Sequence, residues 1–414
     1  MKIILRDFKK SLLISLWFMF LTFPLVVVRV NTIENVVVWR WSNLIWVAAG
    51  SFFLSYLWRY MLARRNRRRK IAEEGVETRG RLQMLLENEQ LRNRVLAILL
   101  ALALVFPLVF DTYQTNIMVT ALIFVVLGLG LNIGVGLAGL LDLGYVAFFG
   151  LGAYCYAILN HNFDLGFWFV LPIGGMIGCL FGVILGFPIL RLRGDYLAIV
   201  TLGFGMLFRV IMENWETLSS GPSGIANIDR PGLFGLEMTL AQSTTYIYYI
   251  MVALVVLTII VTNRLKNSRI GRAWIALRED EVACVAMGID MGRTKLSAYA
   301  LGAFWAGMVG VIFAAKTTFI NPASFTFMES AIILSIVVLG GMGSILGVIL
   351  GAFILILLPE YLRAFAEYRM LIFGAAMVLM MIFRPQGLIS GLRQVYTYKG
   401  HKTHVGVKEQ PINE

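Results

Sequence analysis

Apolar residues run through this 414-residue chain in stretches long enough to cross a bilayer. About 20 consecutive apolar residues span the hydrocarbon core as a helix, so the pattern predicts an all-α, polytopic transmembrane helical bundle with roughly ten to twelve membrane segments. The predicted spans are Ser11–Val30, Trp41–Leu62, Val95–Phe110, Ile117–Leu137, Leu140–Leu159, Gly166–Leu190, Tyr196–Trp215, Thr244–Thr262, Leu296–Thr318 and Met370–Phe383, with a longer run at Met328–Leu358.

The run Met328–Leu358 is too long for a single span and contains the sequence Gly340-Gly341-Met342-Gly343-Ser344. A break in a membrane helix is tolerated where the freed backbone is buried in protein or lines a cavity. A break at these glycines would make two short passes and return the basic tail to the side of the N-terminus. We therefore predict a broken or re-entrant hairpin at 328–358.

Composition excludes a soluble domain, because 59% of the residues are hydrophobic and only 14% are charged, against roughly 25% charged in an average soluble domain. Most of the 36 Lys and Arg fall in alternate segments between the predicted spans, above all at Arg64–Lys70. By the positive-inside rule, both termini are then cytoplasmic. Topology therefore accounts for the net charge of +12, and no aromatic platform supports nucleic-acid binding.

Charge and hydropathy also divide the chain. We expect an N-terminal extension over 1–94, made of two transmembrane helices and a basic cytoplasmic arm. The membrane core follows over 95–390 and includes a charged cytoplasmic loop at 263–295, and a polar cytoplasmic tail occupies 391–414.

Small residues recur every fourth position in three of the predicted spans, which places them on one helix face. Such stripes let helix backbones approach closely, because lipid supplies no hydrophobic drive for association. The stripes predict close helix–helix packing at Gly174, Gly178, Gly182 and Gly186; at Gly302, Ala306, Gly310 and Ala314; and at Gly343, Gly347 and Gly351.

No pattern of catalytic residues is present. The three histidines are His161, His401 and His404, and no metal-binding or disulfide spacing involves the three cysteines. The chain also lacks a phosphate-binding Gly-x-x-x-x-Gly-Lys-Ser/Thr loop, so any ATP must be bound by another polypeptide. We expect a non-enzymatic subunit with no cofactor or metal of its own.

Two charged features lie within or beside the predicted spans. Asp142 ends an apolar stretch, and it reads either as a helix cap or as a ligand contact, with the cap favoured. Arg209 and Glu213 are four residues apart in one span, which favours a structural ion pair.

The cytoplasmic segment Ser268–Arg293 has the pattern of an amphipathic helix. Trp274, Leu277, Glu281 and Val285 fall near one face, and Gly288 is well placed to end the helix. This combination suits docking into a groove on a soluble partner. The alternative is an ordinary helix lying on the membrane surface.

Several stretches together resemble the LivM-type permease family of branched-chain amino acid ABC importers. They occur in the family's order between about Ile117 and Ile389, and only their combination is specific. These stretches are LAGLLDLGYVAFFGLGAY at 137–154, LRGDYLAIVTLGF at 192–204, GPSGI at 221–225, GRAWIALREDEVA at 271–283, LGGMGS at 339–344 and RPQGL at 384–388.

The resemblance implies the function of a transmembrane permease subunit in the bacterial inner membrane, importing Leu, Ile or Val from the periplasm. Its partners would be a second homologous permease subunit, two subunits that use ATP and Mg, a periplasmic substrate-binding protein and membrane lipid, and no nucleic acid. The same family carries urea or short amides, which remain an alternative. A self-sufficient secondary carrier or channel is the alternative from another class.

By the same resemblance, the 271–288 segment would be the coupling helix, although its Glu281-Val282-Ala283…Gly288 sequence matches the family pattern only partly. The expected coupling residues are Arg272, Trp274, Leu277, Glu279, Asp280, Glu281, Ala283 and Gly288. The expected translocation path or gate comprises Asp142, Gly144, Gly340, Gly341, Gly343 and Ser344. The periplasmic loop expected near the binding protein is Gly221, Pro222, Ser223 and Gly224.

Overall fold

The computed structural model describes residues 101–189, 192, 194–232 and 239–361, together with positions 15, 19, 28–31, 36–39, 48, 51, 55, 374, 378 and 387–389. The chain divides into two compact units, Met1–Ile98 and Leu99–Glu414. Most of the predicted spans Ser11–Val30, Trp41–Leu62 and Met370–Phe383, and all of the basic arm and the 391–414 tail, lie outside the described residues.

Two short strands are described in the first unit. Strands β1 (Val28–Asn31) and β2 (Val36–Trp39) pair in antiparallel fashion. The Ser15 hydroxyl donates to the carbonyl of Ala48 at 2.9 Å, which joins the two predicted N-terminal spans at one point.

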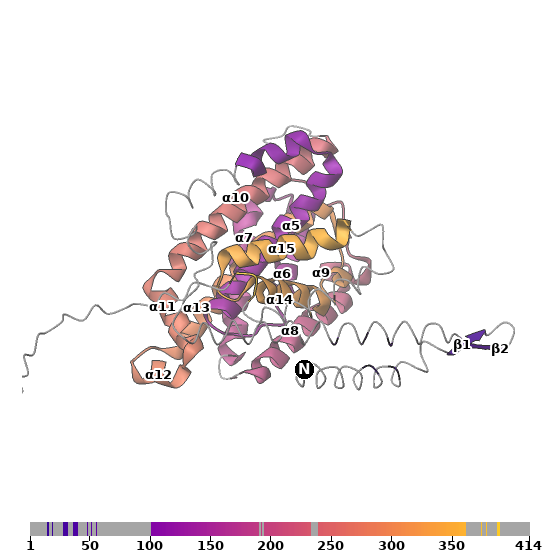
Figure 1. Cartoon of the computed structure of the whole chain (residues 1–414). Coiled ribbons are helices and arrows are strands. Elements are labelled where there is room, and N and C mark those ends of the chain that lie inside the picture. Colours follow the sequence, from indigo (N-terminus) through magenta and orange to yellow (C-terminus); the bar gives the residue numbers. More distant parts are fainter. Residues whose placement is uncertain are drawn as a thin grey trace, which may run out of the picture. The chain divides into compact units, whose positions relative to one another are not determined.

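The second unit is built from helices, which confirms the all-α prediction. Six of its described helices are long and apolar enough to cross a membrane, and α15 is a shorter apolar helix. Figure 1 shows their arrangement. The main helices are α5 (Thr112–Leu131), α6 (Val146–Phe163), α7 (Phe167–Ile189), α8 (Asp195–Asn214), α10 (Leu240–Lys266), α11 (Arg269–Glu279), α12 (Glu281–Ala286), α13 (Met291–Thr317), α14 (Phe327–Gly340) and α15 (Ile345–Tyr361). Shorter elements lie between them: the π-helix η1 (Asn132–Leu137), α9 (Glu216–Ser219), and the 3-10 helices η2 (Gly221–Ser223) and η3 (Pro322–Ser324). The strands β3 (Ile225–Ala226) and β4 (Phe319–Ile320) pair with each other.

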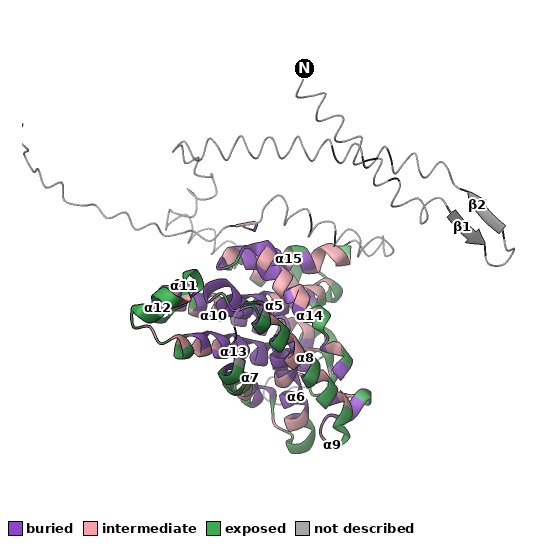
Figure 2. Ribbon diagram, turned by 90° about the horizontal axis from the view of Figure 1, so that it is seen from below, coloured by how far each residue is buried: buried purple, intermediate pink, exposed green. Residues whose placement is uncertain are grey.

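Helix α13 forms the centre of this unit and packs against α5, α6 and α7. In the most apolar 18-residue stretch of α13, 83% is buried, whereas in the corresponding stretch of α8 only 28% is buried. Figure 2 shows the same contrast. Gly307 explains how three helices meet here, because a Cβ on it would overlap the carbonyl oxygen of Gly174, and a Cβ on Gly152 would overlap that of Gly307. The predicted packing role of the glycine stripes is confirmed.

The predicted break in Met328–Leu358 is also confirmed. Helix α14 ends at Gly340 and α15 begins at Ile345, and the linking residues Gly341 and Gly343 have φ of +111° and +81°. Other residue types rarely adopt such angles. The two helices fold back on each other closely, since a Cβ on Gly351 would lie 2.7 Å from the carbonyl oxygen of Ile336.

The bundle has two distinguishable ends, and we name each by a residue. At the Arg278 end, Lys266 Nζ donates to the Gly343 carbonyl at 2.9 Å. At the Lys316 end, the Tyr113 hydroxyl donates to Glu360 at 2.5 Å. Helix α15 connects the two ends, since its 17 residues measure about 25 Å.

The chain returns to the Arg278 end after α15. The backbone N–H of Leu388 donates to the Leu339 carbonyl at 2.8 Å, and that of Ile389 donates to Gly340 at 3.2 Å. Residues 388–389 therefore lie beside the α14–α15 turn, at the end opposite Tyr361.

Candidate functional site

The loop expected to dock on a partner contains two helices where the sequence predicted one. Asp280 interrupts the pattern with φ −156° and ψ 113°, and its carboxylate accepts hydrogen bonds from the backbone N–H groups of Val282 and Ala283 at 2.8 and 3.0 Å. Asp280 therefore caps α12 instead of continuing α11. Gly288, with φ of +80°, follows the end of α12 as predicted.

The apolar face of α11 points into the protein. Trp274 is fully buried, and its indole N–H donates to the Thr294 carbonyl at 3.0 Å and the Ser297 hydroxyl at 3.1 Å, both on α13. Leu277 is buried beside it. These two residues hold the loop on the bundle, so a partner cannot contact them unless they move. The exposed members of the predicted coupling set are Arg272, Glu279, Asp280, Ala283 and Gly288.

Helix α12 is tied to α13 by an ion pair. The Glu281 carboxylate lies 2.5 Å from the Lys295 ammonium, whose side chain is 2% exposed. A buried ammonium that loses its partner carboxylate is strongly destabilising, whatever the net value of the intact pair. Glu281 thus has a structural role in positioning α12.

The outer surface of α12 and the turn after it is apolar. Val282, Val285 and Met287 are 69%, 52% and 83% exposed. We name these three residues the α12 tip. The sequence pattern did not single out Val282 and Met287. It assumed one helix through 268–293, and because the helix is broken at Asp280, the residues beyond Asp280 point to other sides than that helix would give them. Clustered exposed apolar residues on a charged loop are typical of a protein contact.

Two basic residues connect this loop to the membrane helices. Arg278 Nη1 donates to the Gly136 carbonyl in η1 at 2.5 Å, and Lys266 Nζ donates to the Gly343 carbonyl at 2.9 Å. The Gly343 N–H in turn donates to Asn132 Oδ1 at 2.8 Å. We name Asn132, Gly136, Lys266, Arg278 and Gly343 the Arg278 cluster. It joins the loop, the π-helix and the α14–α15 turn, and of its five residues the sequence prediction included only Gly343.

Residues 138–145 form an irregular segment inside the bundle, between η1 and α6. Asp142 is 4% exposed, and its Oδ1 accepts the N–H of Gly144 at 2.9 Å. Tyr145 precedes the first residue of α6, so Asp142 makes a local turn and is not the helix cap that the sequence favoured. The N–H of Leu143 donates to the Thr201 hydroxyl at 3.0 Å on α8. Irregular backbone at this depth is satisfied by protein groups.

One face of helix α8 packs on this irregular segment, and the opposite face of α8 is exposed. Gly144 contacts it closely, since a Cβ on Gly205 would lie 3.2 Å from the Gly144 Cα. On α8, Arg209 Nε pairs with Glu213 at 2.8 Å, and both side chains are about one-third exposed or more, which confirms the predicted ion pair. The predicted path residues therefore lie in two places. Asp142 and Gly144 lie in the irregular segment, where Gly144 packs against α8, whereas Gly340, Gly341, Gly343 and Ser344 lie at the α14–α15 turn.

The Gly221–Gly224 loop lies toward the Lys316 end. Gly221 and Gly224 have φ of +57° and +72°, and a Cβ on Gly224 would overlap the carbonyl oxygen of Ile320. Pro222 and Ser223 between them are exposed. The backbone conformation therefore explains why glycines stand at 221 and 224, and the two exposed residues between them are available for contact.

Among the described residues, no three or more His, Cys, Asp or Glu side chains are grouped so that they could hold a metal ion.

The chain is similar in sequence to several known permease proteins. The chain is 48% identical over 314 residues to the high-affinity branched-chain amino acid transport system permease protein LivM of Escherichia coli, covering 71% of this chain and 74% of the relative. It is 23% identical to the E. coli permease protein LivH over 64% of this chain and 91% of the relative. An autoinducer 2 import system permease, LsrC of an Enterobacter strain, is 25% identical over 64% of this chain and 78% of the relative.

No solved structure matches the chain. The profile of one family, described as branched-chain amino acid transport system / permease component, matches residues 113–381, a range that runs from the second residue of α5 to beyond the end of α15. Because this match covers more than half of the chain and LivM is 48% identical over 71% of this chain, the chain belongs to the branched-chain amino acid transport system permease family.

Proposed function

We propose that this chain is a transmembrane permease subunit of an ATP-driven importer that moves branched-chain amino acids into the cell. The similarity to LivM carries the proposal, because 48% identity far exceeds the 25% shared with the autoinducer 2 permease. The match to a permease named for branched-chain amino acids favours an aliphatic amino acid as the substrate, with urea and short amides as the alternatives. Uptake of labelled leucine and urea by the reconstituted complex tests it, and urea uptake without leucine uptake would refute the assignment.

The α12 tip is the proposed contact with an ATP-binding subunit. Val282, Val285 and Met287 are exposed and apolar, and the exposed carboxylates of Glu279 and Asp280 lie beside them. An apolar centre with a polar rim is the usual anatomy of a protein interface.

Two contacts could transmit a movement of the α12 tip to the membrane helices. The Glu281–Lys295 ion pair links α12 to the central helix α13. Arg278 links α11 to η1, directly before the irregular segment that contains Asp142. We propose that ATP-driven movement of the loop reaches the transport path through these contacts, with Asp142 and Gly144 at the path and the α14–α15 turn as part of the gate.

Coupling is tested by the double variant Val282→Ser/Met287→Ser in the complete complex. We expect ATP-dependent leucine uptake in proteoliposomes to fall at least tenfold, with the chain still inserted in the membrane. Ile270→Ser removes an exposed apolar residue of α11 outside the tip and serves as the control. Equal uptake in both variants would refute the docking surface. Glu281→Lys is a poorer test, because it also destroys the buried pair with Lys295.

A second homologous permease subunit, similar to LivH, is proposed to cover the open face of α8. The reason is Arg209 and Glu213, because charged groups are costly when they face lipid and cheap when they face protein or an aqueous path. The Gly221–Gly224 loop, with Pro222 and Ser223 exposed, is proposed to face the periplasmic binding protein. Cysteine cross-linking from Val210, which is exposed on α8, tests the first contact.

We further propose that the Arg278 end is cytoplasmic, with both termini on that side of the bacterial inner membrane. The basic loop 263–295 and the return of residues 388–389 to this end support this orientation. A reporter fused after Glu414 should be active only in the cytoplasm. Periplasmic activity would contradict the orientation.

ATP and Mg belong to the proposed partner subunits, because the sequence has no phosphate-binding loop. The purified chain alone should neither bind nor hydrolyse ATP and should not transport leucine in liposomes. Transport by the chain alone would favour the self-sufficient carrier.

A further inference from the structure

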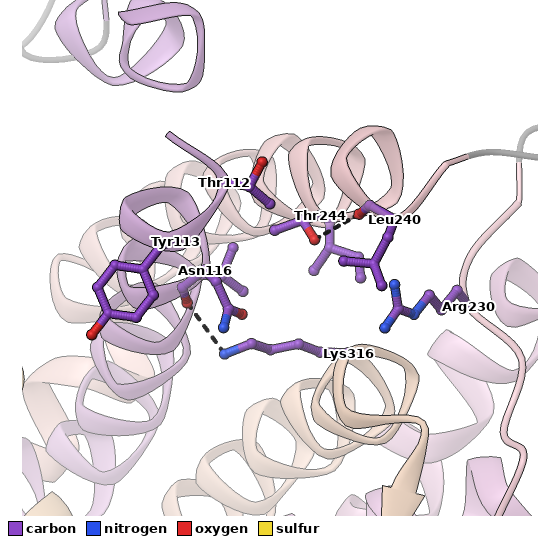
Figure 3. A pocket seen from close by; sticks show the side chains of 9 residues that line it. Thr112, Tyr113, Asn116, Arg230, Leu240, Thr244 and Lys316 are labelled. Carbon is purple, nitrogen blue, oxygen red and sulfur yellow. Dashed lines mark hydrogen bonds between the residues drawn. The ribbon is translucent and has the colours of Figure 1, made fainter. Parts of the chain in front are cut away.

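A small cavity opens at the Lys316 end, between the first turns of α5 and α10 and the last turn of α13 (Figure 3). Its volume is about 220 Å³, below the roughly 300–1,000 Å³ of pockets that enclose drug-sized ligands. The cavity therefore suits a small group. Its lining comprises Thr112, Tyr113, Asn116, Val119, Arg230, Leu240, Thr244, Ile247 and Lys316.

Two cations line this cavity, and neither has a carboxylate partner among the described residues. The Lys316 ammonium donates to the Asn116 carbonyl at 3.3 Å and to the Thr120 hydroxyl. Arg230, from the loop after β3, directs its guanidinium into the cavity (Figure 3). Two cations that share a half-buried cavity repel each other unless an anion lies between them.

The nearby carboxylates are engaged elsewhere. Asp229 accepts from Asn160 Nδ2 at 3.1 Å, and Glu360 accepts from the Tyr113 hydroxyl. Asp111 precedes α5 and is exposed, and it makes no side-chain cap hydrogen bond to that helix. The first N–H groups of α5 thus remain available near the cavity, and a helix N-terminus favours an anion.

The position of the cavity indicates what kind of anion reaches it. It lies at the ends of three helices that are long and apolar enough to span a membrane. Tyr113 and Leu240, on its rim, are 53% and 65% exposed. An exposed tyrosine at the ends of such helices suits the level of lipid headgroups, where tyrosine is enriched on both sides of a membrane. None of the lining residues comes from α8 or from the segment of Asp142, so the cavity is separate from the proposed transport path.

We propose that Lys316 and Arg230 form a binding site for a phosphate-type anion, which is either the headgroup phosphate of an anionic lipid or free phosphate. The site would fix the first turns of α5 and α10 to the end of α13, the helix on which the bundle is packed. Such a site would be present whichever substrate the complex transports.

The test uses the complete complex in neutral detergent and measures its melting temperature with three probes: dihexanoyl phosphatidylglycerol, dihexanoyl phosphatidylcholine and inorganic phosphate. We expect phosphatidylglycerol or phosphate to raise the melting temperature by about 2 °C or more, and phosphatidylcholine to have less effect. Lys316→Gln and Arg230→Gln should each weaken apparent binding about tenfold. Lys316→Arg should retain it.

Arg293→Gln is the matched control, since Arg293 lies on the same helix at the other end, 91% exposed. A Lys316-dependent response to phosphatidylglycerol alone identifies a lipid site, and a response to phosphate as well identifies a site for the free anion. The proposal is overturned if no probe stabilises the complex, or if both Gln variants respond as the wild type does. It is also overturned if leucine stabilises the complex in a Lys316-dependent way, because the cavity would then belong to the transport path. If Lys316→Gln does not assemble, Arg230→Gln, from a loop, still decides the question.

Discussion

Gly182 offers a sharp test of how the bundle is held together, because it lies where α7 crosses α13. A Cβ built on Gly182 would stand 2.8 Å from the Cβ of Ala303 and 3.2 Å from the Cα of Ala300. Carbon atoms that are not bonded sit comfortably at about 3.5–4.0 Å. Even Gly182→Ala therefore requires the two helices to move apart by about 1 Å, and Gly182→Leu requires more.

The cost follows from that separation. A gap of about 0.5–1 Å forfeits a quarter to a half of the dispersion energy of the atoms concerned, and overpacking a well-packed contact costs about 1–3 kcal/mol. Removing a glycine from a helix returns about 1 kcal/mol. We expect Gly182→Ala to lower the free energy of unfolding by about 1 kcal/mol and Gly182→Leu by about 2–3 kcal/mol.

The assay is thermal melting of the purified complex, together with the yield of assembled complex and leucine uptake. Val183→Leu is the control, because Val183 is the neighbouring residue and is 38% exposed. It should leave all three measurements nearly unchanged. If Gly182→Leu melts and assembles as the control does, the close contact between α7 and α13 is not what stabilises the bundle.

Three further predictions concern the Arg278 end. Lys295→Met removes the buried member of its ion pair with Glu281 and should lower the free energy of unfolding by about 3 kcal/mol in a urea melt; adding Glu281→Leu should restore most of that loss, and no recovery would argue against the pair. Arg278→Ala should lower leucine uptake several-fold at unchanged complex yield, since the contact with the π-helix is lost, and unchanged uptake would exclude it from coupling. Gly341→Ala should cost about 1–3 kcal/mol because of its positive φ, whereas Met342→Ala, which is exposed, should be neutral in the same melt.

The sequence alone determined that the chain is an all-helical membrane protein, because spanning helices need apolar runs of fixed length. It also determined the break at Gly340–Ser344 and the packing of the stripe around Gly182. Both are local consequences of glycine, which permits positive φ and close approach of backbones. The ion pair of Arg209 and Glu213 followed from the helical repeat in the same way.

Only the tertiary structure decided where the charged residues and the residues of the loop lie and which groups they contact. Hydropathy along the chain cannot distinguish an apolar residue that anchors a loop, such as Trp274, from one that is exposed, such as Met287. The Arg278 cluster joins residues from η1, α10, α11 and the α14–α15 turn, and the Lys316 cavity joins Lys316 to Arg230, 86 positions earlier in the chain. Such sites depend on which side chains the packing of helices brings within a few ångströms of one another, and sequence spacing does not record that distance.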